Sequence, residues 1–299
     1  MVQRDEVCPV CGGKTELFIP GAVPADDFFR RPSSYKVAAG DAKEHLTVVR
    51  CQRCGHGFTP HVPDEATILA WYRAAEQDES YVTTSVGRRK TARQVLYRIE
   101  ALAPARGALA DVGSGPGFFL AEAEARGWTV KGLEVANWAA TFGREQLGLD
   151  IEQGDYKKLL TWPAQSLDVV CAFDVIEHLV SPIEFLRAGA QALKTDGWLV
   201  ITTPWFDSPL ARLMGKNWYC IFPAHLHYFT RESLTRLLEQ AGFTVEHVHR
   251  HTRYLGWQYV WARFLAQLGV QLRAKTQSSS GFVVPVNLGD EFEIYAQKR

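Results

Sequence analysis

The chain has 299 residues, of which 46% are hydrophobic, and its 33 Lys and Arg residues balance its 33 Asp and Glu residues. This length allows one large domain and a smaller one, each with its own core. A net charge of zero lacks the basic excess of most nucleic-acid-binding proteins and argues against such a partner. The first ten residues contain no apolar signal segment, and polar residues interrupt the most apolar stretch, residues 254–272. We therefore expect a cytoplasmic protein without a membrane span.

Four of the six cysteines form two close pairs near the N-terminus, CPVCGG at Cys8 and Cys11 and CQRCGHGF at Cys51 and Cys54. Two residues between cysteines let one turn direct both thiolates at one ion, and two such turns complete a tetrahedral site. We predict a structural Zn²⁺ ion and a zinc-ribbon-like module over residues 1–62. The 39 residues between the pairs exceed a usual ribbon loop and include a predicted strand at 45–50. Reduced thiols or a redox pair are the alternative.

Strands and helices are expected to alternate after this module. Residues 63–90 are predicted to form a linker with a helix that begins near Asp64 and a polar loop, followed by a helix at 88–103. We expect strands at 108–111, 129–134, near 151, and at 167–173, 198–202, 244–249 and 291–296. Further helices are expected at 117–126, 136–147 and 182–193, and one begins near Thr230. The pattern predicts an α/β fold over residues 91–299: a doubly wound, mostly parallel seven-stranded sheet with insertions at 204–229 and 252–289.

The stretch LADVGSGPGFFL, residues 109–120, joins an apolar strand to an apolar helix through a glycine-rich turn. Asp111 ends the strand, and Gly113, Gly115 and Gly117 follow at alternate positions. Glycines allow a tight turn close to a ligand, and the helix N-terminus offers free N–H groups. Dinucleotide-binding proteins carry a similar loop, so this loop alone does not identify which ligand the site binds.

Acidic residues also follow the next three predicted strands. Glu134 ends one strand, Asp155 follows the strand near 151, and Asp174 follows the strand at 167–173. In a doubly wound sheet these strand ends meet at the carboxyl edge, where ligands bind. With the glycine loop and these three acidic strand ends in this order, residues 91–298 resemble class I S-adenosylmethionine-dependent methyltransferases. The sequence IEH at 176–178 is similar to that of their small-molecule group.

The resemblance implies S-adenosyl-L-methionine as the cofactor. It assigns the amino-acid end of the cofactor to Asp111 and the glycine loop, the ribose hydroxyls to Glu134, and the adenine amino group to Asp155. Phe173 and Asp174 would border the methionine moiety. The full cofactor-binding set is Asp111, Gly113, Ser114, Gly115, Gly117, Glu134, Asp155, Tyr156, Phe173 and Asp174.

Three histidines are candidates for catalysis: His178 after the fourth strand, and His225 and His227 in the sequence PAHLHYFT. Imidazole titrates in the range that a general base needs, and His178 is expected beside the sulfonium. In the alternative, His178 caps a turn and the other two histidines pack in the core. The sequence also resembles the divalent-metal site of small-RNA 3′-terminal 2′-O-methyltransferases, with Asp174, Glu177, His178 and His227 in the matching positions.

The acceptor is expected to bind beside two aromatic segments, residues 202–223 and 253–272. They suggest a lid over a small-molecule acceptor, which could be sugar- or lipid-linked; a packed helix, a dimer contact or a helix at a membrane surface are alternatives. We predict O-methylation of a sugar, glycan precursor or other natural-product hydroxyl. The zinc module followed by a methyltransferase also resembles sugar C-methyltransferases, and a non-catalytic cofactor-binding scaffold is a further alternative.

Overall fold

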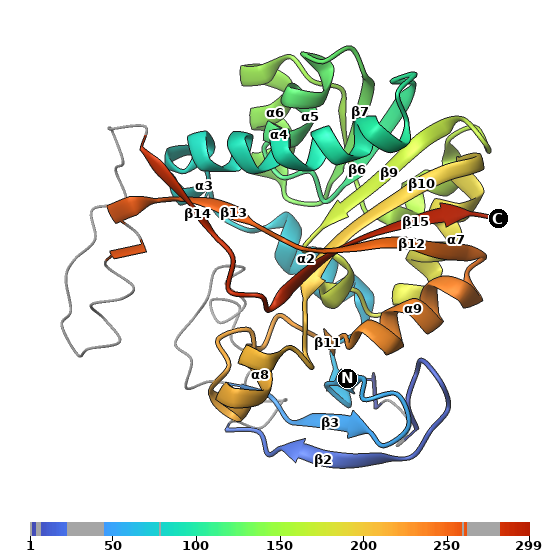
Figure 1. Cartoon of the computed structure of the whole chain (residues 1–299), viewed down its shortest axis with the longest axis vertical. Coiled ribbons are helices and arrows are strands. Elements are labelled where there is room, and N and C mark those ends of the chain that lie inside the picture. The colour runs from blue at the N-terminus through green and yellow to red at the C-terminus, as the bar shows by residue number, and fades with distance from the viewer. Residues whose placement is uncertain (1, 4–6, 23–44, 78, 259, 262–281) are drawn as a thin grey trace.

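A seven-stranded sheet forms the centre of the protein in the computed structural model, which describes residues 2–3, 7–22, 45–77, 79–258, 260–261 and 282–299 (Figure 1). The strand order is β12-β15-β10-β9-β6-β7-β8. The bounds are β6 (Ala108–Val112), β7 (Thr129–Glu134), β8 (Ile151–Gln153), β9 (Leu167–Phe173), β10 (Leu193–Pro204), β12 (Phe243–Arg250) and β15 (Glu291–Lys298). β15 runs antiparallel to both neighbours, and the pairs from β10 to β8 are parallel. The predicted fold class is confirmed.

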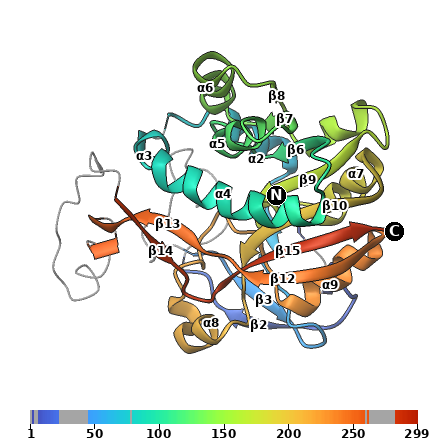
Figure 2. The same ribbon diagram turned by 45° about the horizontal axis from the view of Figure 1, so that its top comes forward.

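Helices cover both faces of this sheet (Figures 1 and 2). Alternate residues of β9 show the division: Val169 and Cys171 pack with one helix layer, and Val170 and Ala172 with the other. This alternation is why β9 is apolar at nearly every position, as expected for a strand buried on both faces. The first layer contains α4 (Ser85–Leu102), α5 (Phe118–Glu124) and α6 (Asn137–Leu147). The second contains η2 (Tyr156–Thr161), α7 (Pro182–Ala192) and α9 (Arg231–Gln240).

The N-terminal module shares a sheet with the large domain. Its strands β2 (Thr15–Ile19), β3 (Val48–Cys51) and β4 (Gly57–Phe58) are extended by β11 (His227–Tyr228), which belongs to the predicted insertion at 204–229. The predicted strand at 45–50 thus begins later, at Val48. β1 (Val2–Gln3) pairs with β5 (His61–Val62), and α2 (Glu65–Arg73) follows with Asp64 as its N-cap, as predicted.

One expectation for the connecting segments needs correction. The predicted polar loop before residue 88 is largely helical, with α3 (Glu79–Thr83) followed by α4 from Ser85. Tertiary contacts favour helix here: the guanidinium of Arg88 lies 3.7 Å from the centre of the Tyr81 ring, which meets the Trp138 ring edge-on. The insertion at 204–229 also contains α8 (Pro209–Met214) and η4 (Gly215–Asn217).

The second insertion begins and ends as a hairpin of β13 (Arg253–Gly256) and β14 (Val283–Val286). The hairpin lies along α4, because Tyr254 N donates to Thr91 Oγ1 at 2.9 Å (Figure 2). Most of the aromatic segment at 253–272 lies outside the described residues. Among the described residues, none of the helices has the length and apolar content needed to cross a bilayer.

Candidate active site

The glycine loop between β6 and α5 is shaped by its surroundings. Gly113 has φ 74° and donates its N–H to Leu133 O at 2.7 Å. A Cβ at Gly113 would lie 2.5 Å from Val175 Cγ2, so a larger residue does not fit. A Cβ at Gly115 (φ 53°), in contrast, would meet only Tyr81 Cε1, at 3.7 Å. The loop is therefore packed behind Gly113 and open at Gly115.

Two carboxylates lie at the carboxyl ends of β6 and β7, beside this loop. Glu134 is buried, and its oxygens accept from Gly115 N and Ala136 N, both at 2.7 Å. Asp111 is buried as well, and its Oδ1 has no hydrogen-bond partner among the described residues. Burial and the nearby charge of Glu134 raise the pKa of Asp111 well above its usual range. Burial also raises the pKa of Glu134, against the effect of the backbone N–H groups.

This edge fits a cationic cofactor. The unpartnered oxygen of Asp111 would gain a hydrogen bond and a counter-charge from an ammonium group, which removes the cost of burying it alone. The hydroxyl of Ser114 in the loop is buried and likewise unpartnered among the described residues. The amino-acid end of S-adenosyl-L-methionine carries both an ammonium and a carboxylate, so both groups have a matching partner.

The predicted adenine-side residues lie at the start of η2. Asp155 caps this short helix, and its Oδ1 accepts from Lys157 N at 2.9 Å. The Tyr156 side chain is buried, and its hydroxyl donates to Glu184 Oε2 at 3.2 Å. Its ring packs edge-on against Phe185 of α7. The side chain of Tyr156 therefore belongs to the layer of η2 and α7.

Asp174 follows β9 in a left-handed conformation (φ 55°), which is unusual for a residue other than glycine. Thr202 Oγ1 donates to its Oδ1 at 3.1 Å, and Arg253 Nη2 to its Oδ2 at 2.7 Å. Burial alone would raise the pKa of Asp174, but the charges of Arg253 and His251 bring it below its ordinary value. Phe173 packs edge-on against Phe119.

Sequence reasoning missed Arg253. It lies on β13 and also donates to Glu291 Oε2 at 2.6 Å, so it joins the second insertion and β15 to the end of β9. No local motif marks it, because its role depends on where the hairpin crosses the sheet. A partly exposed ion pair between such distant segments is found only when the tertiary fold is known.

Glu177, His178 and His225 form a cluster in which the ligand atoms all lie within 4.8 Å of one another. The first two come from η3 (Ile176–His178), and His225 comes from the loop before β11. Leu226 N donates to Glu177 O at 2.9 Å and holds this loop against η3. Burial lowers the pKa of both histidines, that of His225 most strongly. The structure thus brings together two of the three predicted catalytic histidines.

His227 lies elsewhere. Its Nδ1 is 3.0 Å from His56 Nε2 of the N-terminal module, and its ring stacks on Phe229. The metal set suggested by the RNA-methyltransferase resemblance is therefore divided. His227 pairs with His56, and Asp174 pairs with Arg253, although the charge of Asp174 still acts on Glu177 and His178. The two histidines lie in different local structures: His225 is in the loop that Leu226 N holds against η3, whereas His227 is in β11, opposite Phe58 of β4.

The four N-terminal cysteines also converge. Cys11 Sγ lies 3.5 Å from the sulfurs of Cys51 and Cys54, and the sulfurs of Cys8 and Cys54 are 3.7 Å apart. Sulfurs bound to one tetrahedral Zn²⁺ ion at about 2.3 Å lie roughly 3.7 Å apart, so the donor set fits this ion. Gly13 allows this approach, since a Cβ there would lie 3.0 Å from Cys51 Sγ.

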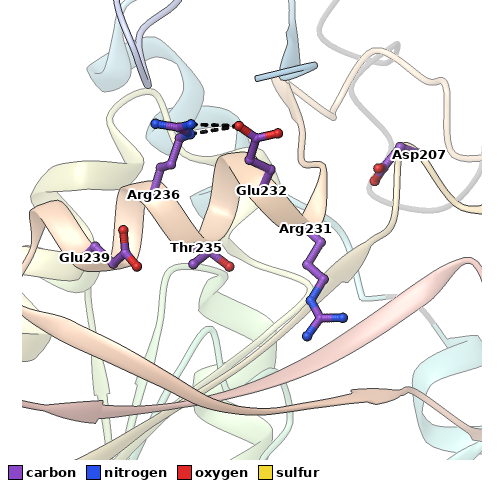
Figure 3. Close-up of a pocket in the computed structure, with 6 residues that line it drawn as sticks. All are labelled: Asp207, Arg231, Glu232, Thr235, Arg236 and Glu239. Atoms are coloured by element: carbon purple, nitrogen blue, oxygen red, sulfur yellow. Dashed lines mark hydrogen bonds and ion pairs between the residues drawn. The ribbon is translucent and has the colours of Figure 1, made fainter. Parts of the chain in front are cut away.

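An open groove of about 580 Å³ runs along α9, and none of the candidate site residues described above lines it. Figure 3 shows that the side chains lining it are charged or polar and that Arg236 and Glu232 pair with each other on the helix surface. Its lining residues are Asp207, Arg231, Glu232, Thr235, Arg236 and Glu239. Its lining contains no cluster of buried polar groups among the described residues.

Comparisons with known proteins find similarity to methyltransferases. The ubiquinone biosynthesis O-methyltransferase of Caulobacter vibrioides is 40% identical over 102 residues, which are 32% of this chain and 40% of that protein. The enzyme of the same name from Dinoroseobacter shibae is 32% identical over 149 residues, 44% of this chain and 58% of that protein. The match thus spans well under two thirds of each relative.

Among solved structures, magnesium protoporphyrin IX methyltransferase from Synechocystis, with bound SAH, superposes with a TM-score of 0.51. The two share 13% sequence identity, and the match covers 79% of this chain and 100% of that one, so the likeness concerns the fold. A family model described as a methyltransferase domain matches residues 87–248. This is more than half of the sequence, and the chain belongs to the methyltransferase-domain family.

Proposed function

We propose that the protein transfers a methyl group from S-adenosyl-L-methionine to a hydroxyl oxygen of a small-molecule acceptor. The observation that carries this proposal is the carboxyl edge of β6 and β7, where the buried and unpartnered Asp111 Oδ1 adjoins an open glycine loop. Membership of the methyltransferase-domain family and the names of the curated relatives support it.

The cofactor would lie across the strand ends. Asp111 and the loop would receive its amino-acid end, and Glu134 its ribose hydroxyls, since each carboxylate oxygen that accepts one backbone N–H can accept a second hydrogen bond. Asp155 would accept from the adenine amino group. Phe173 and Asp174 would border the methionine moiety, with Arg253 holding the Asp174 carboxylate in place.

The acceptor hydroxyl would approach the cluster of Glu177, His178 and His225. When the oxygen attacks, a C–O bond forms and the C–S bond of the sulfonium breaks, with its electron pair left on sulfur. The hydroxyl proton must leave, and we propose that His178, the general base expected from the sequence, accepts it. Removing it in the transition state is the chemical task of this cluster.

Aromatic rings surround the cluster. The centre of the His178 ring lies 6.2 Å from that of the Tyr72 ring and 6.4 Å from that of the Phe222 ring. The ring centres of Phe222 and His225 are 3.9 Å apart. Such surfaces bind planar rings and the apolar faces of sugars. We therefore propose a sugar, a glycan precursor or another natural-product hydroxyl as the acceptor, with quinols and phenols as the chemistry closest to the relatives' names.

A structural Zn²⁺ ion bound by Cys8, Cys11, Cys51 and Cys54 is part of the same proposal. Four thiolates leave no open coordination position, which suits a structural role. The metal would stabilise the module whose strand β4 pairs with β11, directly after the loop that carries His225.

The test is mass spectrometry of ligands that copurify with the protein, followed by an assay of S-adenosylhomocysteine release with nucleotide sugars, quinols and phenols. Copurified cofactor and release with a hydroxyl acceptor are expected. Methyl incorporation at carbon would replace O-methylation with the C-methyltransferase alternative. Tight cofactor binding with no release for any acceptor class would favour the non-catalytic scaffold.

A further inference from the structure

The cluster of Glu177, His178 and His225 has the composition and orientation of a metal site that is separate from the four cysteines. Two imidazoles and one carboxylate converge, with 3.9 Å between His225 Nε2 and Glu177 Oε1. The rings of His178 and His225 have their centres 4.8 Å apart and meet edge-on. All three side chains are held by η3 and the loop that is hydrogen-bonded to it.

Both histidines are oriented by backbone carbonyl groups. His178 Nδ1 lies 2.8 Å from Ala224 O, and His225 Nδ1 lies 2.9 Å from Cys220 O. A carbonyl oxygen only accepts, so each Nδ1 carries the proton and donates it, which leaves the lone pair on Nε2. Histidines that bind metals are typically fixed in this way, with one ring nitrogen on a backbone carbonyl and the other on the ion.

Glu177 supplies the charge. Thr203 Oγ1 donates to its Oε2 at 2.9 Å, but its Oε1 has no hydrogen-bond partner in the described part of the chain. The residue is only 1% exposed. A buried carboxylate oxygen without a partner is costly, and a cation placed between it and the two Nε2 atoms would remove that cost. The charge of Arg253 acts on Glu177, but the Arg253 side chain is already shared by Asp174 and Glu291.

We propose that Glu177 Oε1, His178 Nε2 and His225 Nε2 bind a divalent first-row transition-metal ion. Imidazole ligands favour such ions over Mg²⁺ and Ca²⁺, and a set of two histidines and one carboxylate is known for catalytic ions. Ligands at about 2.1 Å from an ion lie roughly 3 to 3.5 Å apart. The ligand atoms here lie within 4.8 Å of one another, so the longest separation would shorten by roughly 1 to 2 Å when the ion binds. Three protein ligands leave coordination positions for an acceptor oxygen.

Binding of the ion depends only on this geometry, whereas its role in catalysis rests on the proposed function. The ion would bind the acceptor oxygen and lower the pKa of its hydroxyl, and the proton would pass to water. His178 would then be a ligand in place of the proton acceptor. The bonds formed and broken at carbon and sulfur stay the same.

The experiment uses the full chain with one zinc ion per molecule in the four-thiolate site. The protein is first treated with a mild chelator, which removes more weakly bound metal and leaves this zinc in place. Mn²⁺ and Co²⁺ are titrated separately, with free Mn²⁺ followed by electron paramagnetic resonance and Co²⁺ by calorimetry. One additional saturable site is expected. Glu177→Gln and His225→Gln should each weaken it at least about tenfold, since each removes a ligand. His61→Gln, which alters an exposed histidine on β5, should bind as the parent does.

Circular dichroism shows whether each variant is folded, and S-adenosyl-L-methionine affinity gives a second readout of an intact sheet edge. No saturable site for either ion, or unchanged affinity in folded Glu177→Gln and His225→Gln, would overturn the inference. If the ion binds as expected but methyl transfer continues after chelation, the proposed catalytic role of the ion is refuted. His178 is then the general base, as under the proposed function. If the parent protein does not bind S-adenosyl-L-methionine, that result would instead count against the proposed function.

Discussion

Glu134 and Gly115 are joined by a hydrogen bond of 2.7 Å from the glycine N–H to Oε2 of the carboxylate. The acid at the end of β7 therefore holds the open position of the glycine loop from the neighbouring strand. Its other oxygen accepts from Ala136 N at the start of α6. One side chain thus shapes the loop and faces the expected position of the ribose.

Replacing Glu134 by Ala should weaken S-adenosyl-L-methionine binding by about 1–3 kcal/mol, because the ribose hydroxyls and two backbone N–H groups lose their acceptor. Calorimetric titration measures this. Glu124→Ala, at an exposed position on α5, removes the same charge and should leave the affinity unchanged. Equal affinities for the two variants would remove Glu134 from the ribose site.

Gly115→Val should abolish cofactor binding while the protein still folds. A Cβ at Gly115 meets only Tyr81 within the protein, so the side chain would extend into the space expected for the ligand. The positive φ costs about 1–2 kcal/mol for a residue with a Cβ. Gly127→Val is the matched control, with φ 92° and no atom within 4 Å of the added Cβ. It carries similar strain and should bind the cofactor normally, and equal binding by both variants would place the ligand elsewhere.

The alternating pattern of apolar strands and helices was sufficient to predict the central sheet. Boundaries such as Thr129–Glu134 and Phe243–Arg250 agree with the prediction to within one residue at each end. The N-terminal module was predicted from its cysteines, but its sheet was not, because β11 comes from a segment more than 160 residues further along the chain. Two-residue strands have too little periodicity to be recognised before their partner is known.

The same limit applies to the site. The acids at the strand ends were predicted because the topology of a parallel sheet brings strand ends together. The sequence alone did not distinguish His225 from His227, which are two residues apart. Their difference arises from contacts with η3 on one side and with His56 on the other. Arg253 depends in the same way on the path of the hairpin across the sheet.

Metal analysis should find about one tightly bound zinc per chain at the four thiolates. Cys51→Ser should lose this zinc and lower the melting temperature of the N-terminal module, whereas cofactor binding by the large domain should persist. Cys171→Ala, which alters a buried thiol on β9, should retain the zinc. Protein that lacks zinc even when the metal is supplied during expression would contradict the assignment. Retention of zinc in Cys51→Ser would contradict it as well.

His178→Ala should lower turnover by about 10²–10⁴-fold with little change in cofactor affinity, because the imidazole acts on the acceptor in the transition state. This holds whether His178 takes the proton or binds the proposed ion. His178→Gln keeps a polar group of similar reach and should recover little activity. His61→Ala serves as the control in steady-state assays. Near-normal turnover in His178→Ala would move the acceptor chemistry to His225.

Cofactor affinity should increase with pH through the titration of Asp111. Burial and the charge of Glu134 raise the pKa of this carboxyl in the free protein, so it is protonated over part of the accessible pH range. A bound ammonium group favours the ionised form, and binding therefore releases a proton. A lower proton concentration therefore favours the complex, and the affinity rises by about tenfold per pH unit while one proton is released.

Calorimetry in buffers of different ionisation enthalpy measures this proton release directly. Asp111→Asn keeps the shape of the side chain but cannot titrate, so it should bind the cofactor more weakly and with a smaller dependence on pH. Glu134 remains in that variant, and burial raises its pKa as well. Any pH dependence of cofactor affinity left in Asp111→Asn therefore measures the contribution of Glu134. A pH dependence of the same size in the parent and in Asp111→Asn would assign the released proton to Glu134. An affinity that falls with rising pH below about pH 7, where the α-amino group of the cofactor stays protonated, would exclude an ammonium group as the partner of Asp111.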